Sequence, residues 1–211
     1  MAITIKDMLL TPNKWSRPQT KIRTIKNIVV HWIGNAGSTA ENNAKYFNSL
    51  KDGRGTYASS HYIIGNDGVV IRCVPENEVA YHASSANNYS IGIEVCHPDG
   101  TGKYTDLAYN ALIELLSDLC ERYKLEPTQA IIRHYDVTGK DCPRYYVKNT
   151  EAWNKLRQDV ANAVDKDEEL ESAVKVLQEK CIISSPEVWI RGEYSKNNVR
   201  SLVIKVANSL K

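Results

Sequence analysis

Two short apolar runs, each followed by a histidine, most constrain how this chain can fold. Ile28–Val30 is followed by His31, and Ala130–Arg133 is followed by His134. Runs of this length and composition are typical of buried strands, so each histidine is expected where a strand ends. Cys142 follows His134 by eight positions and lies in a polar segment. The pattern predicts that the two histidines and this cysteine meet in space.

Two histidines and one cysteine are a ligand set that zinc uses in proteins. Catalytic zinc sites usually have three protein ligands and keep a fourth position open for water. We therefore interpret His31, His134 and Cys142 as the ligands of one zinc site. The alternative is that each histidine caps its strand and makes ordinary hydrogen bonds. A second alternative uses Cys142 as a nucleophile with His134 as its partner, as in a Cys–His hydrolase.

The other cysteines are expected to be structural. The chain has five cysteines in 211 residues, an odd number at irregular spacings, so a disulfide framework is not predicted. Cys73, Cys96 and Cys120 lie inside apolar runs and are interpreted as small buried hydrophobic residues. Cys142 differs from them because its segment is polar and Pro143 follows it.

The composition is that of a soluble globular protein with balanced charge. The 27 basic and 25 acidic residues give a formal net charge of +2, which gives no reason to expect a nucleic-acid groove or a membrane anchor. No apolar stretch approaches the roughly 20 residues that span a bilayer. The first residues, Met1–Asp7, lack the pattern of a secretory signal. The product is therefore expected to accumulate in the cytoplasm until it is released.

Both strand and helix patterns occur within the first 165 residues. Alternating or apolar runs predict strands, and amphipathic stripes predict helices. The expected strands are 28–30, 60–64, 69–74, 91–96 and 130–133, with an Asp-Gly hairpin turn at 65–68. The expected helices are about 39–50, 105–123 and 151–165, with a loop at 135–149. This pattern indicates an α/β fold with a mixed central sheet flanked by helices.

A charged run at Asp165–Glu169 changes the character of the chain. We interpret it as a boundary between a catalytic domain at 1–165 and a small helical module at 168–211, although a solvated helix face has the same composition. The module has amphipathic helix signals around Leu170–Leu177 and Val199–Val206, and Ser185 followed by Pro186 is typical of a helix start.

Five motifs carry a resemblance to a known family. In chain order they are Ile28–Trp32, Ser60–Gly68, Tyr81–Ala83, Ser90–Glu94, and Arg133–His134 together with Lys140–Pro143. With these motifs the chain resembles the zinc-dependent N-acetylmuramoyl-L-alanine amidases of the amidase type 2 group, which share a fold with T7 lysozyme and the peptidoglycan recognition proteins. The resemblance covers roughly two thirds of the chain, about Lys21 to Val160. The loop that follows His31 resembles endolysins of phages and prophages of Gram-positive bacteria.

The resemblance implies a role for each matching residue. It assigns zinc (Zn²⁺) to His31, His134 and Cys142, the general base to Glu94, and stabilisation of the developing oxyanion to Lys140. The T7 enzyme has a tyrosine at the position occupied here by Ser60, so no phenol from this position can take part in catalysis. The assignment of the catalytic base therefore depends more heavily on Glu94. From the residues alone, Glu94 is also compatible with a solvated strand face, and Lys140 with an exposed loop.

Three further residues are expected near the substrate. His82, in the Tyr81–Ala83 motif, is expected to line the groove and contact substrate; the alternative is a structural histidine. Trp32 and Asn35 are expected to form a groove wall, because an exposed aromatic ring suits a sugar face. A Trp32 that packs inside the fold is equally compatible with the sequence.

The implied function is hydrolysis of the bond between N-acetylmuramic acid and L-alanine in bacterial peptidoglycan. The expected partner is peptidoglycan, with no nucleic acid and no membrane. A phage endolysin without a signal sequence would act on the wall after a holin opens the membrane. The segment Lys180–Trp189 resembles a module of clostridial-type peptidoglycan hydrolases, which implies wall binding or a homodimer through this module. The rival interpretation is a peptidoglycan-binding protein without catalysis; such members commonly lack the cysteine ligand, which is present here.

Overall fold

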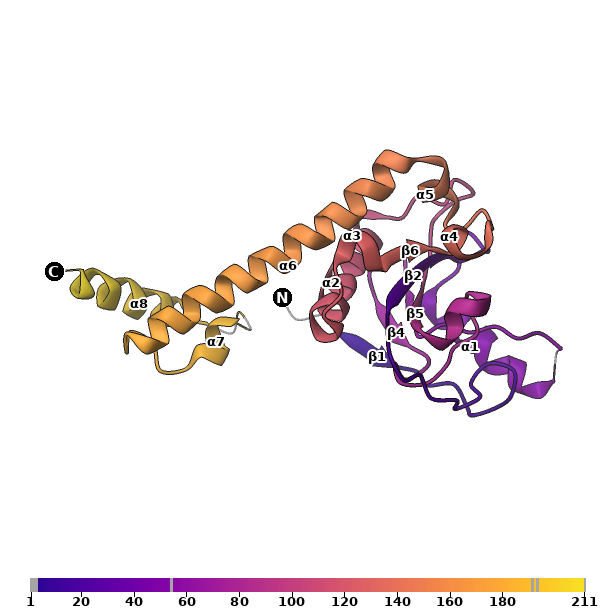
Figure 1. Ribbon diagram of the computed structural model, residues 1–211, viewed down its shortest axis with the longest axis horizontal. Helices are drawn as coiled ribbons and strands as arrows, with labels where there is room; N and C mark the ends of the chain where they lie inside the picture. The colour runs from indigo at the N-terminus through magenta and orange to yellow at the C-terminus, as the bar shows by residue number, and fades with distance from the viewer. Residues whose placement is uncertain (1–3, 54, 191, 193, 211) are drawn as a thin grey trace. The chain divides into compact units, whose positions relative to one another are not determined.

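A six-stranded sheet forms the centre of the larger of two structural units. The computed structural model describes residues 4–53, 55–190, 192 and 194–210, and for 165–168 it describes the backbone alone. The larger unit spans Ile3–Ala161, and the smaller one includes Asn162–Lys211 (Figure 1). The division falls four residues before the charged run in which the sequence suggested a boundary.

The sheet is mixed, as the sequence predicted. Its strands are β1 (Ile5–Asp7), β2 (Asn27–Trp32), β3 (Tyr62–Ile64), β4 (Val70–Arg72), β5 (Ser90–Val95) and β6 (Ile131–Arg133). Their order across the sheet is β1-β4-β3-β5-β2-β6. All neighbouring strands are parallel except β3 and β4. The α/β class with a mixed central sheet is therefore confirmed.

The antiparallel pair β3–β4 is the predicted hairpin. Its turn closes with a hydrogen bond from the Gly65 amide to the Val69 carbonyl, and Gly68 adopts a φ of 81°, which glycine tolerates without strain. The strand β1 was not predicted, because three residues are too short to show periodicity. It lies at the sheet edge beside β4, and Asp7 forms a bidentate ion pair with Arg72 at 2.7 and 2.8 Å.

The helices of the larger unit cover both faces of this sheet. They are α1 (Ala40–Ser49), the 3₁₀ turns η1 (Leu50–Asp52) and η2 (Ser84–Asn88), α2 (Asp106–Tyr123), α3 (Pro127–Ala130), α4 (His134–Thr138), α5 (Arg144–Lys148) and the start of α6 (Thr150–Glu179). The short helices α4 and α5 lie where the sequence predicted a loop. Four- and five-residue helices carry too few apolar positions for a 3.6-residue period to be visible.

The two faces of the sheet have different roles. Side chains alternate along a strand, so β5 directs Ile91, Ile93 and Val95 to one face and Gly92 and Glu94 to the other. The first face is apolar and lies toward α2 (Figure 1). On the second face, Ile63 and Ile71 pack in the apolar cluster that includes residues of α1. On β2 and β5 the same face carries His31 and Glu94. The fold therefore leaves a polar region beside β2 and β5, on the face opposite α2.

Helix α1 begins one residue later than its sequence pattern suggested. Ser38 and Glu41 have the spacing of a capping box, but the N-cap is Thr39, whose hydroxyl accepts a hydrogen bond from the Asn42 amide at 3.2 Å. Glu41 instead pairs with Lys6 of β1. The N-cap preference is satisfied by either hydroxyl residue, so the sequence alone could not separate them.

The predicted helix break at Asp165 is wrong. Helix α6 continues through the charged run to Glu179, so the run at 165–169 is helical backbone and not a linker. Lys and Glu have good helix propensity, so such a run can interrupt the apolar stripe without breaking the helix. Among the described residues, no helix combines the length and apolarity that crossing a membrane requires.

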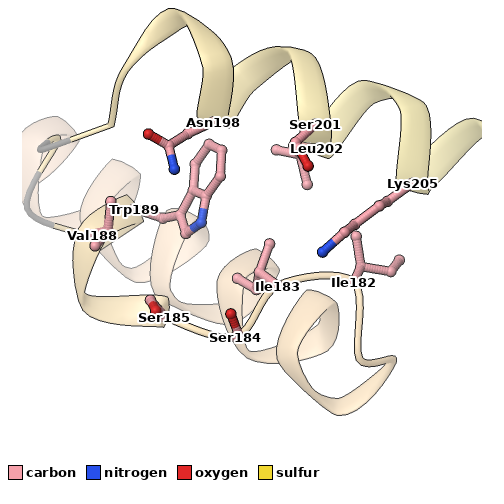
Figure 2. A pocket seen from close by; sticks show the side chains of 10 residues that line it. All are labelled: Ile182, Ile183, Ser184, Ser185, Val188, Trp189, Asn198, Ser201, Leu202 and Lys205. Atoms are coloured by element: carbon pink, nitrogen blue, oxygen red, sulfur yellow. The ribbon is translucent and has the colours of Figure 1, made fainter.

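The smaller unit has its own apolar cluster, formed by the end of α6, α7 (Pro186–Ile190) and α8 (Lys196–Ser209). The cluster contains Val174, Leu177, Ile182, Ile183, Trp189, Leu202 and Val206. A pocket of about 150 Å³ opens beside it. Figure 2 shows the Trp189 indole and the Lys205 side chain directed into the space between α8 and the segment that leads into α7.

Candidate functional site

His31 and Glu94 become neighbours because β2 and β5 pair in parallel. The register places His31 opposite Glu94, with both side chains on the polar face of the sheet. The His31 Nδ1 atom lies 3.9 Å from the Glu94 Oε1 atom. Two residues 63 positions apart are thus brought together by strand pairing alone.

His134 reaches the same place from the other side of β2. Strand β6 pairs with β2 and ends at Arg133, so His134 is the first residue of α4. The Asp136 carboxylate accepts a hydrogen bond from the Arg133 amide at 2.8 Å, which satisfies the start of this helix. The rings of His31 and His134 lie edge to face with centroids 4.6 Å apart.

Cys142 is delivered by the loop that follows α4. The helix ends at Gly139, whose φ of 78° turns the chain back. The Cys142 carbonyl then accepts a hydrogen bond from the Tyr135 amide at 2.9 Å, which ties the loop to α4. The Cys142 Sγ atom lies 3.8 Å from His31 Nδ1. The structure therefore brings together the three residues that the sequence singled out.

The cluster has the features of a metal site. The candidate ligand atoms of His31, His134 and Cys142 all lie within 4.8 Å of one another. Within the described part of the chain, His134 Nδ1 and Glu94 Oε2 are buried and have no hydrogen-bond partner. Buried polar atoms are normally satisfied, so an unmet partner is expected here. Two imidazoles and a thiol form a donor set suited to zinc. The residues fit this metal.

The electrostatics of the ligands also suit a cation. Burial, together with the nearby Lys140 charge, lowers the pKa of His134 to about 4. Burial likewise holds the pKa of His31 well below its usual range. Both imidazoles are therefore neutral near pH 7, which is the form that binds metal. Burial raises the pKa of the Cys142 thiol to about 12, so a bound cation would have to displace its proton.

The position and the pKa of Glu94 are those that a general base could use. Its side chain is 17% exposed, and burial raises the pKa of its carboxyl to about 8, against the opposing effect of the Lys140 charge. A group whose pKa lies near neutrality can both accept and return a proton at physiological pH. Lys140 itself is exposed on the loop between α4 and Cys142, where its charge acts on Glu94, His31 and His134.

His82 does not lie on an open surface. Its side chain is buried behind His31, with His82 Nδ1 3.1 Å from His31 Nε2. His61 is also buried: its Nδ1 accepts a hydrogen bond from the Gly92 amide at 2.9 Å, and its Nε2 donates to the Glu78 carbonyl at 2.9 Å. The structure therefore places His82 next to a predicted ligand, whereas the sequence suggested a groove wall.

The Trp32 backbone hydrogen-bonds the Cys142 thiol. Among the described residues, no contact joins the Trp32 ring or Asn35 to the three cluster side chains. The Trp32 ring is half-buried and stacks on His97 with centroids 4.6 Å apart. The Arg144 guanidinium lies 4.5 Å from the centroid of the same ring. Asn35 is exposed, and its carbonyl accepts hydrogen bonds from the Ser38 amide and hydroxyl. These ring contacts favour the alternative in which Trp32 packs inside the fold.

Tyr104 is a neighbour of the site that the sequence did not indicate. It is buried, and its hydroxyl donates a hydrogen bond to the His31 carbonyl at 3.0 Å. Its ring packs against Tyr146 of α5, with centroids 4.7 Å apart. The backbone of β2 at His31 is thereby linked to the segment that follows Cys142. A tyrosine just before a helix start carries no sequence signal for this contact.

Comparison with known proteins gives one family. Residues 21–145 match the family described as N-acetylmuramoyl-L-alanine amidase. A probable N-acetylmuramoyl-L-alanine amidase of Bacillus licheniformis is 32% identical over 203 residues, which cover 90% of this chain and 55% of that protein. The N-acetylmuramoyl-L-alanine amidase CwlL of the same species is 36% identical over 161 residues, covering 70% of this chain and 44% of that protein.

The fold is shared with solved structures. The structure of PlyL superposes with a TM-score of 0.63 at 23% identity, covering 74% of this chain and 96% of that one. At this identity the likeness shows the fold. The chain spans about half the length of the curated relatives that it matches.

Proposed function

The chain belongs to the N-acetylmuramoyl-L-alanine amidase family, and on that premise we propose that it hydrolyses the amide bond between N-acetylmuramic acid and L-alanine in bacterial peptidoglycan, with zinc as cofactor. One observation carries the proposal. His31, His134 and Cys142 converge within 4.8 Å beside Glu94, whose buried Oε2 has no partner among the described residues. A ligand set and an adjacent carboxyl base are what metal-assisted amide hydrolysis requires.

His31, His134 and Cys142 would hold the metal. When bound, zinc supplies a Lewis acid that polarises the scissile carbonyl and acidifies water. The ligands come from a strand end, a helix start and a loop tied to that helix, so their positions are set by the sheet and by α4. Ligands that are carried by well-packed elements keep their positions during turnover.

Glu94 would move the proton. Its carboxyl can take a proton from the attacking water and then give it to the amide nitrogen of L-alanine as that bond breaks. Amide nitrogen is a poor leaving group unless it is protonated, so one residue serves both steps. Its buried position beside His31 supports this role.

Lys140 would stabilise charge. Its ammonium lies on the loop beside the cluster, where it can interact with the negative charge that develops on the carbonyl oxygen. A donor aimed at such an oxyanion typically contributes about 3 kcal/mol. The exposed position of Lys140 suits a residue that meets the substrate from the solvent side.

A Cys–His hydrolase is less well supported by the site. A cysteine nucleophile needs a lowered thiol pKa, whereas burial raises the pKa of Cys142 to about 12. The thiol also lies beside two histidines, His31 and His134, whereas a catalytic Cys–His pair requires only one. A Cys–His enzyme would survive chelators and be inactivated by thiol alkylation.

The deciding experiment identifies the bond that is cut. Purified Gram-positive cell walls are digested with and without a chelator, and the products are analysed by mass spectrometry and by labelling of new amino groups. The proposal expects new L-alanine amino termini that disappear with the chelator and return with zinc. Zinc bound to the protein without such termini would contradict amidase activity and favour a binding protein.

For the smaller unit we propose attachment to the cell wall. The pocket beside Trp189 combines an aromatic ring with polar groups, namely Asn198, Ser201 and Lys205. Indole rings and hydrogen-bonding groups are typical of sites that hold sugars. The test is sedimentation of the full chain with purified walls, comparing Trp189→Ala and Lys205→Ala with Val203→Ala, an exposed position on α8. Equal binding by all variants, or a wild-type dimer that forms without walls, would contradict the proposal.

A further inference from the structure

We propose that His82 and Ser90 are positioning residues, which hold His31 in the tautomer that leaves its Nδ1 atom free for the metal. This inference rests on the metal site of the proposed function. It concerns a chain of hydrogen bonds behind His31, on the side away from Cys142. His31 Nε2 lies 3.1 Å from His82 Nδ1, and His82 Nε2 lies 3.4 Å from Ser90 Oγ.

The far end of this chain fixes its direction. The Ser90 hydroxyl donates a hydrogen bond to the Ala86 carbonyl at 2.6 Å, and a carbonyl oxygen can only accept. With its hydrogen committed, Ser90 Oγ accepts from His82 Nε2, and the Ser90 backbone also hydrogen-bonds the His82 ring. His82 Nδ1 then carries a lone pair and accepts from His31 Nε2. The one remaining ring nitrogen, His31 Nδ1, is unprotonated.

That nitrogen is the one that faces the other ligands. His31 Nδ1 lies 3.8 Å from Cys142 Sγ and 3.9 Å from Glu94 Oε1. In a neutral histidine the hydrogen bond made by one ring nitrogen selects the tautomer and leaves the other free to bind a metal. The hydrogen bond to the Ala86 carbonyl therefore fixes, through the side chains of Ser90 and His82, which ring nitrogen of His31 is free.

The strand β5 is built to seat the His82 ring. A side chain at Gly92 would bring its Cβ within 2.4 Å of the His82 Cγ atom, so glycine makes room for the ring. Ser90 and Glu94 flank this glycine on the same face of the strand. Three successive residues of that face thus supply a hydrogen-bond acceptor, the space for the ring and the catalytic carboxylate.

The backbone of His82 is also fixed. The Asn87 side-chain oxygen accepts hydrogen bonds from the amides of His82 and Ala83, at 3.0 and 2.7 Å. The side chain is 9% exposed, so little of it is available to a substrate. These contacts favour a role behind the metal ligand over the substrate contact that the sequence suggested.

The test measures zinc affinity and the tautomer, independently of turnover. Ser90→Ala removes the hydroxyl acceptor but keeps the backbone hydrogen bond of residue 90 to His82. His82→Phe keeps a ring but removes both nitrogens. The matched control is Ser117→Ala, because Ser117 is also buried and its hydroxyl also donates to the carbonyl four residues earlier, but in α2 on the opposite face. Loss of such an outer partner typically lowers metal affinity about 10- to 100-fold.

We expect zinc affinity, measured by chelator competition, to fall about tenfold in Ser90→Ala and up to 100-fold in His82→Phe, with Ser117→Ala unchanged. Nitrogen-15 NMR of the metal-free wild type should show His31 protonated at Nε2, and Ser90→Ala should show mixed tautomers. Protonation at Nδ1 in the wild type, or wild-type affinity in Ser90→Ala, would overturn the inference. If His82→Phe fails to fold, Ser90→Ala still decides, since it removes a single atom. The tautomer is read without zinc or substrate, so a failure of amidase activity would be seen separately.

Discussion

His31 and Glu94 face each other across the parallel pair β2–β5, with Nδ1 and Oε1 3.9 Å apart. In the proposed mechanism, this one register pair of the sheet would supply both a metal ligand and the carboxyl base. Because parallel strands fix the relative height of their residues, the distance between these two groups is set by the backbone. Changes to the Glu94 side chain should consequently affect proton transfer without disturbing the ligands.

Glu94→Gln should keep zinc and lose most turnover. The amide has nearly the same size as the carboxyl but cannot accept the proton, and loss of a general base typically costs about 10²- to 10⁴-fold in rate. The measurement pairs kcat on purified walls with zinc content by atomic spectroscopy. Activity near that of the wild type would exclude Glu94 as the base, and loss of zinc would show that it acts as a ligand.

Lys140→Met should lower kcat and leave zinc content intact. Methionine keeps an unbranched chain one atom shorter but loses the charge placed beside the cluster. Loss of one oxyanion donor typically costs about 10²- to 10³-fold. Lys51→Met is the control, because Lys51 is exposed on η1 and is not among the charges that act on the site residues. A rise in KM with unchanged kcat would instead indicate that Lys140 only binds substrate.

The parts of the site that could be predicted from the sequence are those fixed by periodicity. Alternation along β5 placed Glu94 on the face opposite Ile91 and Ile93, and the apolar runs before His31 and His134 placed both histidines at strand ends. These relations depend on the two-residue period of a strand, which can be read from a few residues. Periodicity does not place Cys142, which reaches the two histidines through the loop that follows α4.

The rest depends on tertiary contacts that leave no local pattern. The position of His82 follows from the turn held by Asn87 and from the space above Gly92, neither of which a motif reveals. The packing of Trp32 depends on His97, which arrives from the end of the neighbouring strand. Helix α6 continues through charged residues because helix propensity does not require an apolar stripe.

Removal of the metal should abolish hydrolysis, and replacement of Cys142 should prevent its return. We expect Cys142→Ala to bind far less than one zinc per chain, because one of three protein ligands is missing. Cys73→Ala is the control: Cys73 is equally buried but belongs to the apolar cluster under α1. Zinc content and wall hydrolysis are measured after dialysis against chelator and then zinc. Equal zinc content in the two variants would remove Cys142 from the ligand set.

Zinc affinity should rise as the pH rises. Burial holds the pKa of the Cys142 thiol at about 12, so zinc must displace its proton at any lower pH, while the histidine ligands are already neutral. Release of one proton predicts about a tenfold gain in affinity per pH unit between pH 6 and 7.5. The titration is done with Glu94→Gln, so that no second carboxyl proton contributes. A flat profile would show that the thiol is not the ligand.

Glu76 should contribute stability that is lost in acid. Burial alone would raise its pKa, but hydrogen bonds from Arg122, Tyr123 and Tyr62 lower the pKa to about 2. A carboxyl whose folded pKa lies below its usual value stabilises the fold above about pH 5, and this contribution disappears as the pH falls toward 2. Allowing for solvent screening, we expect about 2 kcal/mol at pH 7.

The measurement is urea unfolding of the wild type and of Glu76→Gln from pH 7 to pH 2. The difference in unfolding free energy should be about 2 kcal/mol at neutral pH and shrink below pH 5. Glu114→Gln is the control, because Glu114 is exposed on the same helix, α2, that carries Arg122 and Tyr123. A difference that stays constant with pH would mean that Glu76 acts through packing, since only an ionised carboxylate loses its contribution on protonation.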